Sequence, residues 1–499
     1  MRTPRGGLHD VVLDDDDGDG ENRSSPATAP GGSDPGPVRR FARRWRWPVA
    51  GVVVLALAVP SVVGSRREAA RLADLADVPG ILAPLDGPVR ELWTTADYPY
   101  PFTSELGGVL VGVAFNLADL ADVTEIPAPN VHGIDARTGR ELWSMSLGGQ
   151  SGGPQCVPAA GPVTGPHQAV LVCVVVDSVA DVSAGDTAAD SPGESGWNPP
   201  DHVHLAVLDP RTGRVLREQA AAPDDGLVSF GTDVVRTTKV DGGTDVTRLD
   251  PRTGRVVWTS QHAVVAGELA QSGYAEPHDD GLLVSAGSTA WLLSSTGKVL
   301  DEWDVATADG WSLVQAGGHV LRGAYESNGP GLVLTDLING VTITPSEDSS
   351  IRQGVDDGSV PGVLFTSGAD LVAWDLDSGK PRWQVEGSGY GASDSTIVLD
   401  GVVYALRYGV VSAVDGRGGE ELWQIRTELS GPYDLATDGR SLLVLGSVAG
   451  SATSTVRALN PTDGRTQWDA PLTHVAQSLE VSGGHLFAQT DEGTFVALG

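Results

Sequence analysis

Few residues of this chain have the types and the spacing that chemistry needs. Asp15, Asp17, Asp19 and Gly20 match the first half of a calcium-binding loop. Such a loop needs a bidentate glutamate at its twelfth position, where this chain has Pro26. The segment is better explained as a solvated acidic tail. The sequence also contains no nucleophile elbow, phosphate-binding loop or zinc motif.

His202 and His204 form the second candidate for chemistry. Two residues apart on a strand, their imidazoles would share one face, as a pair of metal ligands can. No third ligand stands near them in the sequence, and histidines on a strand face are usually solvated. We therefore expect no metal site, and we assign no catalytic residue.

Cys156 and Cys173 are the only cysteines of the chain. The segment between them could form a hairpin that brings the two thiols together. In an exported domain we expect a disulfide between them, and two reduced thiols in the core are the alternative.

The charge of the protein is carried by its main body. The net charge is −32, yet residues 1–47 hold eight Arg against eight acidic residues and sum to zero. A body this acidic repels nucleic acid and anionic lipid headgroups, so we expect neither as a partner. The N-terminal tail has almost no apolar residues to bury up to residue 38, and it is expected to be disordered.

A membrane span is predicted directly after this tail. The basic segment RRFARRWRW, at 39–47, is followed by 17 uncharged and mostly apolar residues at 48–64. As a helix this run would rise about 26 Å, near the lower limit for crossing the hydrocarbon core. The arginines precede the span, which predicts a cytoplasmic N-terminus and places everything after Gly64 outside the cell. A cleavable signal peptide with its site near Ala56–Ala58 is the alternative, and it also places the body outside.

The heptapeptide LDPRTGR occurs at 208–214 and again at 249–255, and it belongs to a longer series. Successive members are separated by 74, 41, 43, 43, 39, 40 and 45 residues, which indicates a repeat of about 42 residues with one insertion. The series is aligned on eight glycines: Gly139, Gly213, Gly254, Gly297, Gly340, Gly379, Gly419 and Gly464.

Each repeat places side chains of one type at fixed distances from its glycine. An Asp or Asn four positions earlier can accept N–H bonds from a turn, the glycine can supply a positive φ, and a Trp four positions later can pack on a neighbouring sheet. Leu293 is the one exception at the Asp/Asn position. Five sets are complete: Asp135, Gly139 and Trp143; Asp250, Gly254 and Trp258; Asp375, Gly379 and Trp383; Asp415, Gly419 and Trp423; Asn460, Gly464 and Trp468.

The repeats predict an all-β propeller. Each repeat has room for four short strands, and its apolar residues alternate with period two. We expect about eight four-stranded blades over 83–499, with seven or nine as alternatives, preceded by the transmembrane helix at 48–64 and a short helical stalk at 65–82. The segment 493–499 has the character of the first half of a repeat and 85–93 that of the second half. The two ends should therefore share one blade and close the ring.

The units at 373–383, 413–423 and 458–468 resemble the repeat of the pyrroloquinoline quinone (PQQ) propeller family, Ala-x-Asp-x-x-x-Gly-x-x-x-Trp. The resemblance covers roughly residues 85–499 and implies that each Trp stacks on the next blade. It also implies one of two functions. Some members are dehydrogenases that hold PQQ and calcium in the central channel. Others are scaffolds without catalysis, such as the lipoprotein of the outer-membrane assembly machinery and the sensor parts of membrane kinases.

The sequence favours the second function. The dehydrogenases that resemble this fold commonly hold a disulfide of adjacent cysteines against the cofactor, and this chain has no adjacent pair. We expect a single-pass plasma-membrane protein whose external propeller binds a protein or small ligand, with no cofactor. A membrane-tethered PQQ-dependent dehydrogenase of alcohols or sugars is the alternative, so enzymatic activity stays an open question.

The long gap between the first two glycines marks an insertion at about 177–201. It contains one large aromatic residue, Trp197. Because long loops on rigid scaffolds often carry function, Trp197 is a candidate anchor for a protein partner. A loop without a role is the equally weighted alternative.

Overall fold

The computed structural model describes residues 66–499, apart from the segments 96–103, 115–129, 149–155, 161–168, 179–201, 265–273, 306–310, 327–330 and 387–394 and the short interruptions 77, 223–224, 279–280, 347–348, 350, 352, 369, 408 and 492–493. In this part of the chain, strands β1 to β36 form nine sheets. Middle strands are apolar on both sides, as in Gly281–Ala286, where all six residues are buried. Outer strands such as Glu141–Ser146 bury one side only. This difference is expected for sheets that pack face to face around a ring.

Each sheet is one blade, and we number the blades along the chain. Blades 1 to 3 contain β2 (Ser104–Glu105), β3 (Val109–Ala114), β4 (Asn130–Asp135) and β5 (Glu141–Ser146); β6 (Cys156–Ala159), β7 (Val170–Ser178), β8 (His202–Leu208) and β9 (Val215–Ala220); β10 (Gly226–Phe230), β11 (Asp233–Val240), β12 (Gly243–Asp250) and β13 (Arg255–Ala263). Blades 4 to 6 contain β14 (Tyr274–His278), β15 (Gly281–Ala286), β16 (Thr289–Leu293) and β17 (Val299–Asp304); β18 (Trp311–Ala316), β19 (His319–Glu326), β20 (Gly331–Asp336) and β21 (Thr342–Ile343); β23 (Val363–Ser367), β24 (Leu371–Asp375) and β25 (Pro381–Val385). Blades 7 to 9 contain β22 (Gln353–Asp356), β26 (Ser395–Leu399), β27 (Val402–Arg407), β28 (Val410–Asp415) and β29 (Glu421–Arg426); β30 (Leu429–Thr437), β31 (Leu442–Val448), β32 (Thr455–Leu459) and β33 (Thr466–Pro471); β34 (Ala476–Ser482), β35 (His485–Thr490), β36 (Phe495–Leu498) and β1 (Glu91–Thr94).

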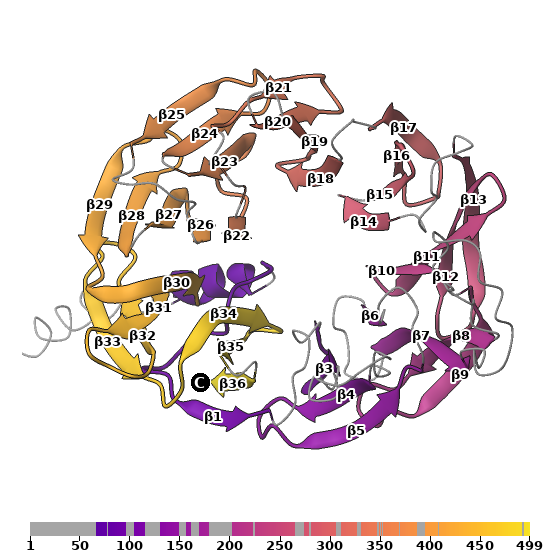
Figure 1. The fold of residues 1–499 in the computed structure, drawn as a ribbon, viewed down its shortest axis with the longest axis horizontal. Coiled ribbons are helices and arrows are strands. Elements are labelled where there is room, and N and C mark those ends of the chain that lie inside the picture. Colours follow the sequence, from indigo (N-terminus) through magenta and orange to yellow (C-terminus); the bar gives the residue numbers. More distant parts are fainter. Residues whose placement is uncertain are drawn as a thin grey trace, which may run out of the picture. The chain divides into compact units, whose positions relative to one another are not determined.

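The protein is a nine-bladed propeller, in which the blades follow one another around a ring with their first strands toward its centre (Figure 1). The expectation of about eight blades is therefore wrong by one, and the alternative of nine is correct. Every glycine of the repeat series lies in the turn that precedes the outer strand of its own blade, from Gly139 to Gly464. The ninth blade has no such glycine because the chain ends meet there.

The ring is closed by strands from both ends of the chain, as the sequence predicts. Strand β1 pairs antiparallel with β36, with Glu91 opposite Leu498 and Thr94 opposite Val496. The backbones of Arg90 and Gly499 also exchange hydrogen bonds of 3.1 and 3.0 Å. Strand β1 therefore completes the four-stranded sheet of blade 9 and covers the edge of β36 that would otherwise be unpaired.

The core of the ring lies between blades. Eight clusters of buried apolar side chains each join two neighbouring blades. No such cluster among the described residues joins blades 4 and 5. Polar contacts join these two blades instead: Nδ1 of His278 lies 2.6 Å from Oε1 of Gln315, whose amide donates to the Pro277 carbonyl at 3.0 Å.

Blade 6 departs from the four-stranded pattern. Strand β22 precedes its other strands in sequence, but β22 pairs in parallel with β26 of blade 7. Gln353 lies opposite Thr396, and Asp356 lies opposite Val398. Blade 6 consequently keeps three strands and blade 7 has five.

Residues 66–75 form a helix within the segment expected to be a stalk. From Ala69 onward this segment belongs to the same compact unit as the propeller. Leu75 is buried among residues of blades 7 and 8, including Ile397 and Leu442. Arg71 pairs with Asp400 at 2.6 Å and donates to the Gly439 carbonyl at 2.7 Å. The described end of the segment is therefore packed on the propeller.

The predicted membrane span at 48–64 lies outside the described residues. Among the residues that the structure describes, no helix is both long and apolar enough to cross a membrane.

Candidate functional site

The Asp, Gly and Trp residues of the repeat are brought together at the boundaries between blades. In blade 1, Asp135 accepts hydrogen bonds from the backbone N–H of Thr138 at 2.9 Å and from its hydroxyl at 2.8 Å. These bonds lower the pKa of Asp135, chiefly through the Thr138 hydroxyl. Gly139 follows with φ +68°, and a Cβ there would lie 2.4 Å from the ring of Trp93. The turn thus needs glycine for two reasons: the positive φ is strained for other residues, and a side chain would clash with the Trp93 indole.

Four of the five docking Trp residues donate their indole N–H to a turn carbonyl of the next blade. Trp143 donates to Pro210 at 2.8 Å, and Trp258 donates to Ser295 at 2.9 Å. Trp383 and Trp423 make the same bond to Gly416 and Pro461, at 3.0 and 2.9 Å. Trp468 packs against the cluster between blades 8 and 9. The geometry assigns these residues to the assembly of the ring.

Three of the eight repeats have a polar residue four positions after the glycine in place of the Trp: Arg217 in blade 2, Asp301 in blade 4 and Thr344 in blade 5. Arg217 occupies this position in blade 2, where its guanidinium lies 2.2 Å from the site of a Cβ on Gly254. In blade 4 the turn is one residue shorter, because Ser294 N–H bonds to the Lys298 carbonyl only four residues later. Ser294, and not Leu293, therefore occupies the Asp/Asn position, and its hydroxyl accepts the Lys298 N–H at 3.1 Å. The expectation that Leu293 holds the Asp/Asn position was wrong by one residue, because it assumed the same turn length in every repeat.

The remaining predicted residues lie away from one another. Cys156 and Cys173 face each other on β6 and β7 and are joined by a disulfide in the core between blades 1 and 2. His202 and His204 lie on β8, and no group of three metal-binding side chains occurs in the described ranges. Trp197 and the insertion from residue 179 onward lie outside the described residues.

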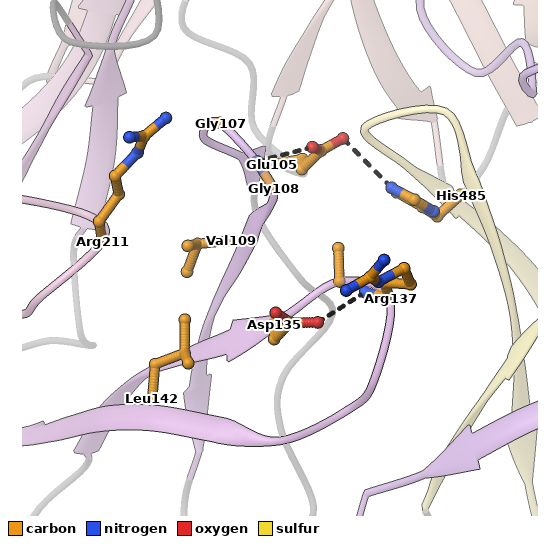
Figure 2. A pocket seen from close by; sticks show the side chains of 10 residues that line it. Glu105, Gly107, Gly108, Val109, Asp135, Arg137, Leu142, Arg211 and His485 are labelled. Atoms are coloured by element: carbon orange, nitrogen blue, oxygen red, sulfur yellow. Dashed lines mark hydrogen bonds and ion pairs between the residues drawn. The ribbon is translucent and has the colours of Figure 1, made fainter.

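A cleft of about 480 Å³ opens where blades 9, 1 and 2 meet. We call this end of the ring the turn face, because antiparallel strands place the first and third turns of every blade at the same end. The cleft is lined by the β2–β3 turn at Gly107 and Gly108 and by the β4–β5 turn at Asp135 and Arg137. Arg211 reaches it from the next blade and His485 from the preceding one (Figure 2). The propeller thus builds one recess from three blades.

The acidic wall of the cleft is already paired. Glu105 lies 3.3 Å from Nε2 of His485 and accepts the Gly108 N–H at 3.0 Å. The hydrogen bond from His485 lowers the pKa of Glu105, against the opposing effect of burial. Glu105 is therefore held as a carboxylate at neutral pH and is a poor proton donor.

The basic residues of the cleft are not paired in this way. The guanidinium groups of Arg137 and Arg211 lie on opposite sides of the recess, with the apolar side chain of Val109 between them and that of Leu142 below in the view of Figure 2. Both arginines are exposed, and no hydrogen bond or ion pair joins either guanidinium to a described residue. Two separated cations above an apolar floor are suited to binding an anionic group, not to bond chemistry.

The sequence contained a signal for part of this site only. Arg137 and Arg211 occupy the same place in the repeated RTGR turns. Glu105 and His485, in contrast, come from opposite ends of the propeller chain, so no local pattern could connect them.

The described residues do not fit a PQQ and calcium site. Such a site needs several oxygen ligands around the cation, and no three carboxylate, His or Cys side chains converge in the described part of the chain. The disulfide is buried in the wall between two blades, with Cys173 fully enclosed, and it offers no surface to a quinone ring.

Comparison with known proteins identifies the family. The chain matches the family described as outer membrane protein assembly factor BamB over residues 127–385, 341–480 and 407–499. No curated protein matches the chain. Among solved structures, BamB from Moraxella catarrhalis is 19% identical, with a TM-score of 0.33, covering 60% of this chain and 93% of that one. The computationally designed protein Ika8 is 13% identical, with a TM-score of 0.37, covering 82% of this chain and 98% of that one. Because the family match spans most of its length, this chain belongs to the PQQ-repeat β-propeller family of BamB.

Proposed function

We propose that the protein is a plasma-membrane scaffold whose propeller lies outside the cell and binds a protein or small ligand, without catalysis and without a cofactor. The cleft at blades 9, 1 and 2 is the observation that carries this proposal. Its one carboxylate–imidazole pair is engaged internally, whereas Arg137 and Arg211 are available to a partner. Membership in a family described as an assembly factor supports a role in binding proteins.

Two features support the proposed location. The disulfide between Cys156 and Cys173 is typical of exported proteins, because cytosolic thiols are kept reduced. The arginine cluster before residues 48–64 favours retention of the N-terminus in the cytoplasm. Together they support a single span with the propeller outside.

Photo-crosslinking in intact cells tests the binding role. A photoreactive amino acid replaces Leu142, which lines the cleft, in the full-length chain. Leu422 is the matched control, because it holds the same position relative to its repeat glycine on blade 7 and is also exposed. We expect a discrete crosslinked product from position 142 and none from position 422. Equal crosslinking at both positions, or at neither, would contradict the proposed binding site.

Titration with PQQ and Ca²⁺ tests the absence of catalysis. The full-length protein in nanodiscs is followed by its thermal midpoint and by dye-linked oxidation of simple alcohols and sugars. We expect no saturable shift of the midpoint and no oxidation. A saturable shift with turnover would make the protein a quinoprotein dehydrogenase.

A further inference from the structure

The repeated heptapeptide makes one sector of an acidic protein basic. The turns at 135–140, 209–214 and 250–255, on blades 1, 2 and 3, each carry two Arg and one Asp. The corresponding turns of blades 6 and 7, at 375–380 and 415–420, carry more acidic than basic residues. The turns of blades 1, 2 and 3 are therefore the repeat turns that hold two basic residues each, on a chain whose net charge is −32.

The aspartates of these turns are used within the turns. Asp209 accepts the Arg211 N–H at 3.0 Å, as Asp135 accepts that of Arg137 at 3.2 Å. Arg252 of blade 3 is also engaged, because it donates to the carbonyls of Thr232 and Ala159 at 2.9 and 3.0 Å. Arg137 and Arg211 line the cleft, and their guanidinium groups make no such bond to a described residue.

We propose that the cleft binds an acidic segment of a partner protein. Two carboxylates of the segment pair with Arg137 and Arg211, and an apolar residue between them packs on Val109 and Leu142. A guanidinium presents a planar donor fork that suits a carboxylate, and the apolar floor adds contact area. Two carboxylates also line the cleft, and both already accept hydrogen bonds: Glu105 from His485 and Gly108, and Asp135 from its own turn. This inference rests on the proposed function and names the chemistry of its partner.

The charge distribution favours a protein segment over an anionic membrane surface. A flat bilayer would meet the whole turn face, which also carries exposed acidic residues such as Asp377 and Glu420 on blades 6 and 7. These carboxylates would be repelled by anionic headgroups. A short acidic segment can contact the basic sector alone.

Fluorescence anisotropy on the full-length protein tests the proposal. The protein is held in nanodiscs of phosphatidylcholine, and the probe is a labelled peptide of alternating glutamates and leucines. We expect saturable binding that weakens between about 50 and 500 mM salt. The variant Arg137→Gln/Arg211→Gln should lower the affinity by about 10- to 100-fold. Arg417→Gln is the matched control, because Arg417 holds the same turn position on blade 7, and it should bind like the unmodified protein.

Other results of this binding experiment overturn the proposal. Equal affinity for all three proteins, or equal affinity for a peptide with glutamine in place of glutamate, excludes recognition of carboxylates by these arginines. If nanodiscs with about 30% phosphatidylglycerol abolish peptide binding, the arginines contact lipid instead. The anisotropy experiment measures peptide binding and does not depend on enzymatic activity. Oxidation with PQQ would therefore contradict the proposed function and leave this inference standing. Absence of peptide binding, together with absence of oxidation, would contradict this inference alone.

Discussion

The indole of Trp143 on blade 1 covers Gly213 on blade 2. A Cβ built on Gly213 would lie 2.6 Å from the ring, and the indole N–H donates to the carbonyl of Pro210 in the same turn. The same relationship joins Trp258 to Gly297, Trp383 to Gly419 and Trp423 to Gly464. The repeated Trp and Gly are thus the two halves of one joint between neighbouring blades.

Substitution of Gly213 by Ala should destabilise this joint. Gly213 has φ +65°, which costs an alanine about 1–2 kcal/mol, and the contact with Trp143 should add about 1–3 kcal/mol. Gly242→Ala is the control, because Gly242 has φ +77° with open space around its Cβ position. Urea denaturation should therefore give a larger loss for Gly213→Ala. Equal losses would mean that the indole moves aside without cost.

The boundary between blades 4 and 5 should be the first to open. It lacks both a docking Trp and an apolar cluster among the described residues, and hydrogen bonds among His278, Gln315 and Pro277 join the two blades. Amide hydrogen exchange should be about tenfold faster in β18 than in β34, whose blade shares an apolar cluster with blade 8.

Gln315→Ala tests the same boundary by mutation. Loss of its two contacts should accelerate exchange in β14 and β18 and leave β34 unchanged. Uniform protection of the three strands would show that the polar contacts hold this boundary as firmly as apolar packing holds the others.

His262 should make the stability of the ring depend on pH. Burial against Trp291 lowers its pKa, an effect that exceeds the opposite influence of Glu302 and Asp245. The unfolded chain then binds a proton before the folded chain does. The free energy of unfolding should therefore fall as pH drops below about 6.5, by up to about 1.4 kcal/mol per pH unit until the folded-state pKa is reached.

His262→Phe is the matched variant, because a neutral ring of similar size keeps the contact with Trp291. Urea denaturation between about pH 5 and 7 should show a smaller slope for His262→Phe than for the unmodified protein. Identical slopes would assign the pH dependence to other groups.

Reduction of the disulfide should weaken blade 2. The bond joins Cys156 and Cys173, 17 residues apart, and its loss should cost about 3 kcal/mol because the unfolded chain is no longer cross-linked. Cys156→Ala/Cys173→Ala should reproduce the loss and make the thermal midpoint insensitive to dithiothreitol. A midpoint that dithiothreitol lowers equally in both proteins would point to a non-specific effect of the reductant.

The blade pattern could be predicted from the sequence because its determinants are local. Alternation of apolar residues, the Asp or Asn that accepts turn N–H groups and the glycine with positive φ each act within about ten residues. The eight glycine turns together with the blade shared by the two ends of the propeller make nine units, so the expectation of eight blades left out one unit. Counting back a fixed four residues also missed the shorter turn at Ser294.

Contacts that join distant parts of the chain could not be predicted from local sequence patterns. Arg217 in place of a docking Trp has no repeat signature, and the move of β22 from blade 6 to blade 7 depends on which edge lies nearer in the ring. The recess that joins Glu105 to His485 exists only once blade 9 lies beside blade 1.

The sequence by itself determined the repeat, the turn chemistry and the charge of the RTGR turns, because these depend on neighbouring residues. The tertiary structure alone decided that Arg137 and Arg211 face one cleft while Arg252 is engaged elsewhere. The physical reason is that identical turns acquire different surroundings from the blades beside them. Arg252 lies near backbone carbonyls and donates hydrogen bonds to them, including one of the neighbouring blade. Arg137 and Arg211 make no such bonds to described residues, and their guanidinium groups are available to a partner.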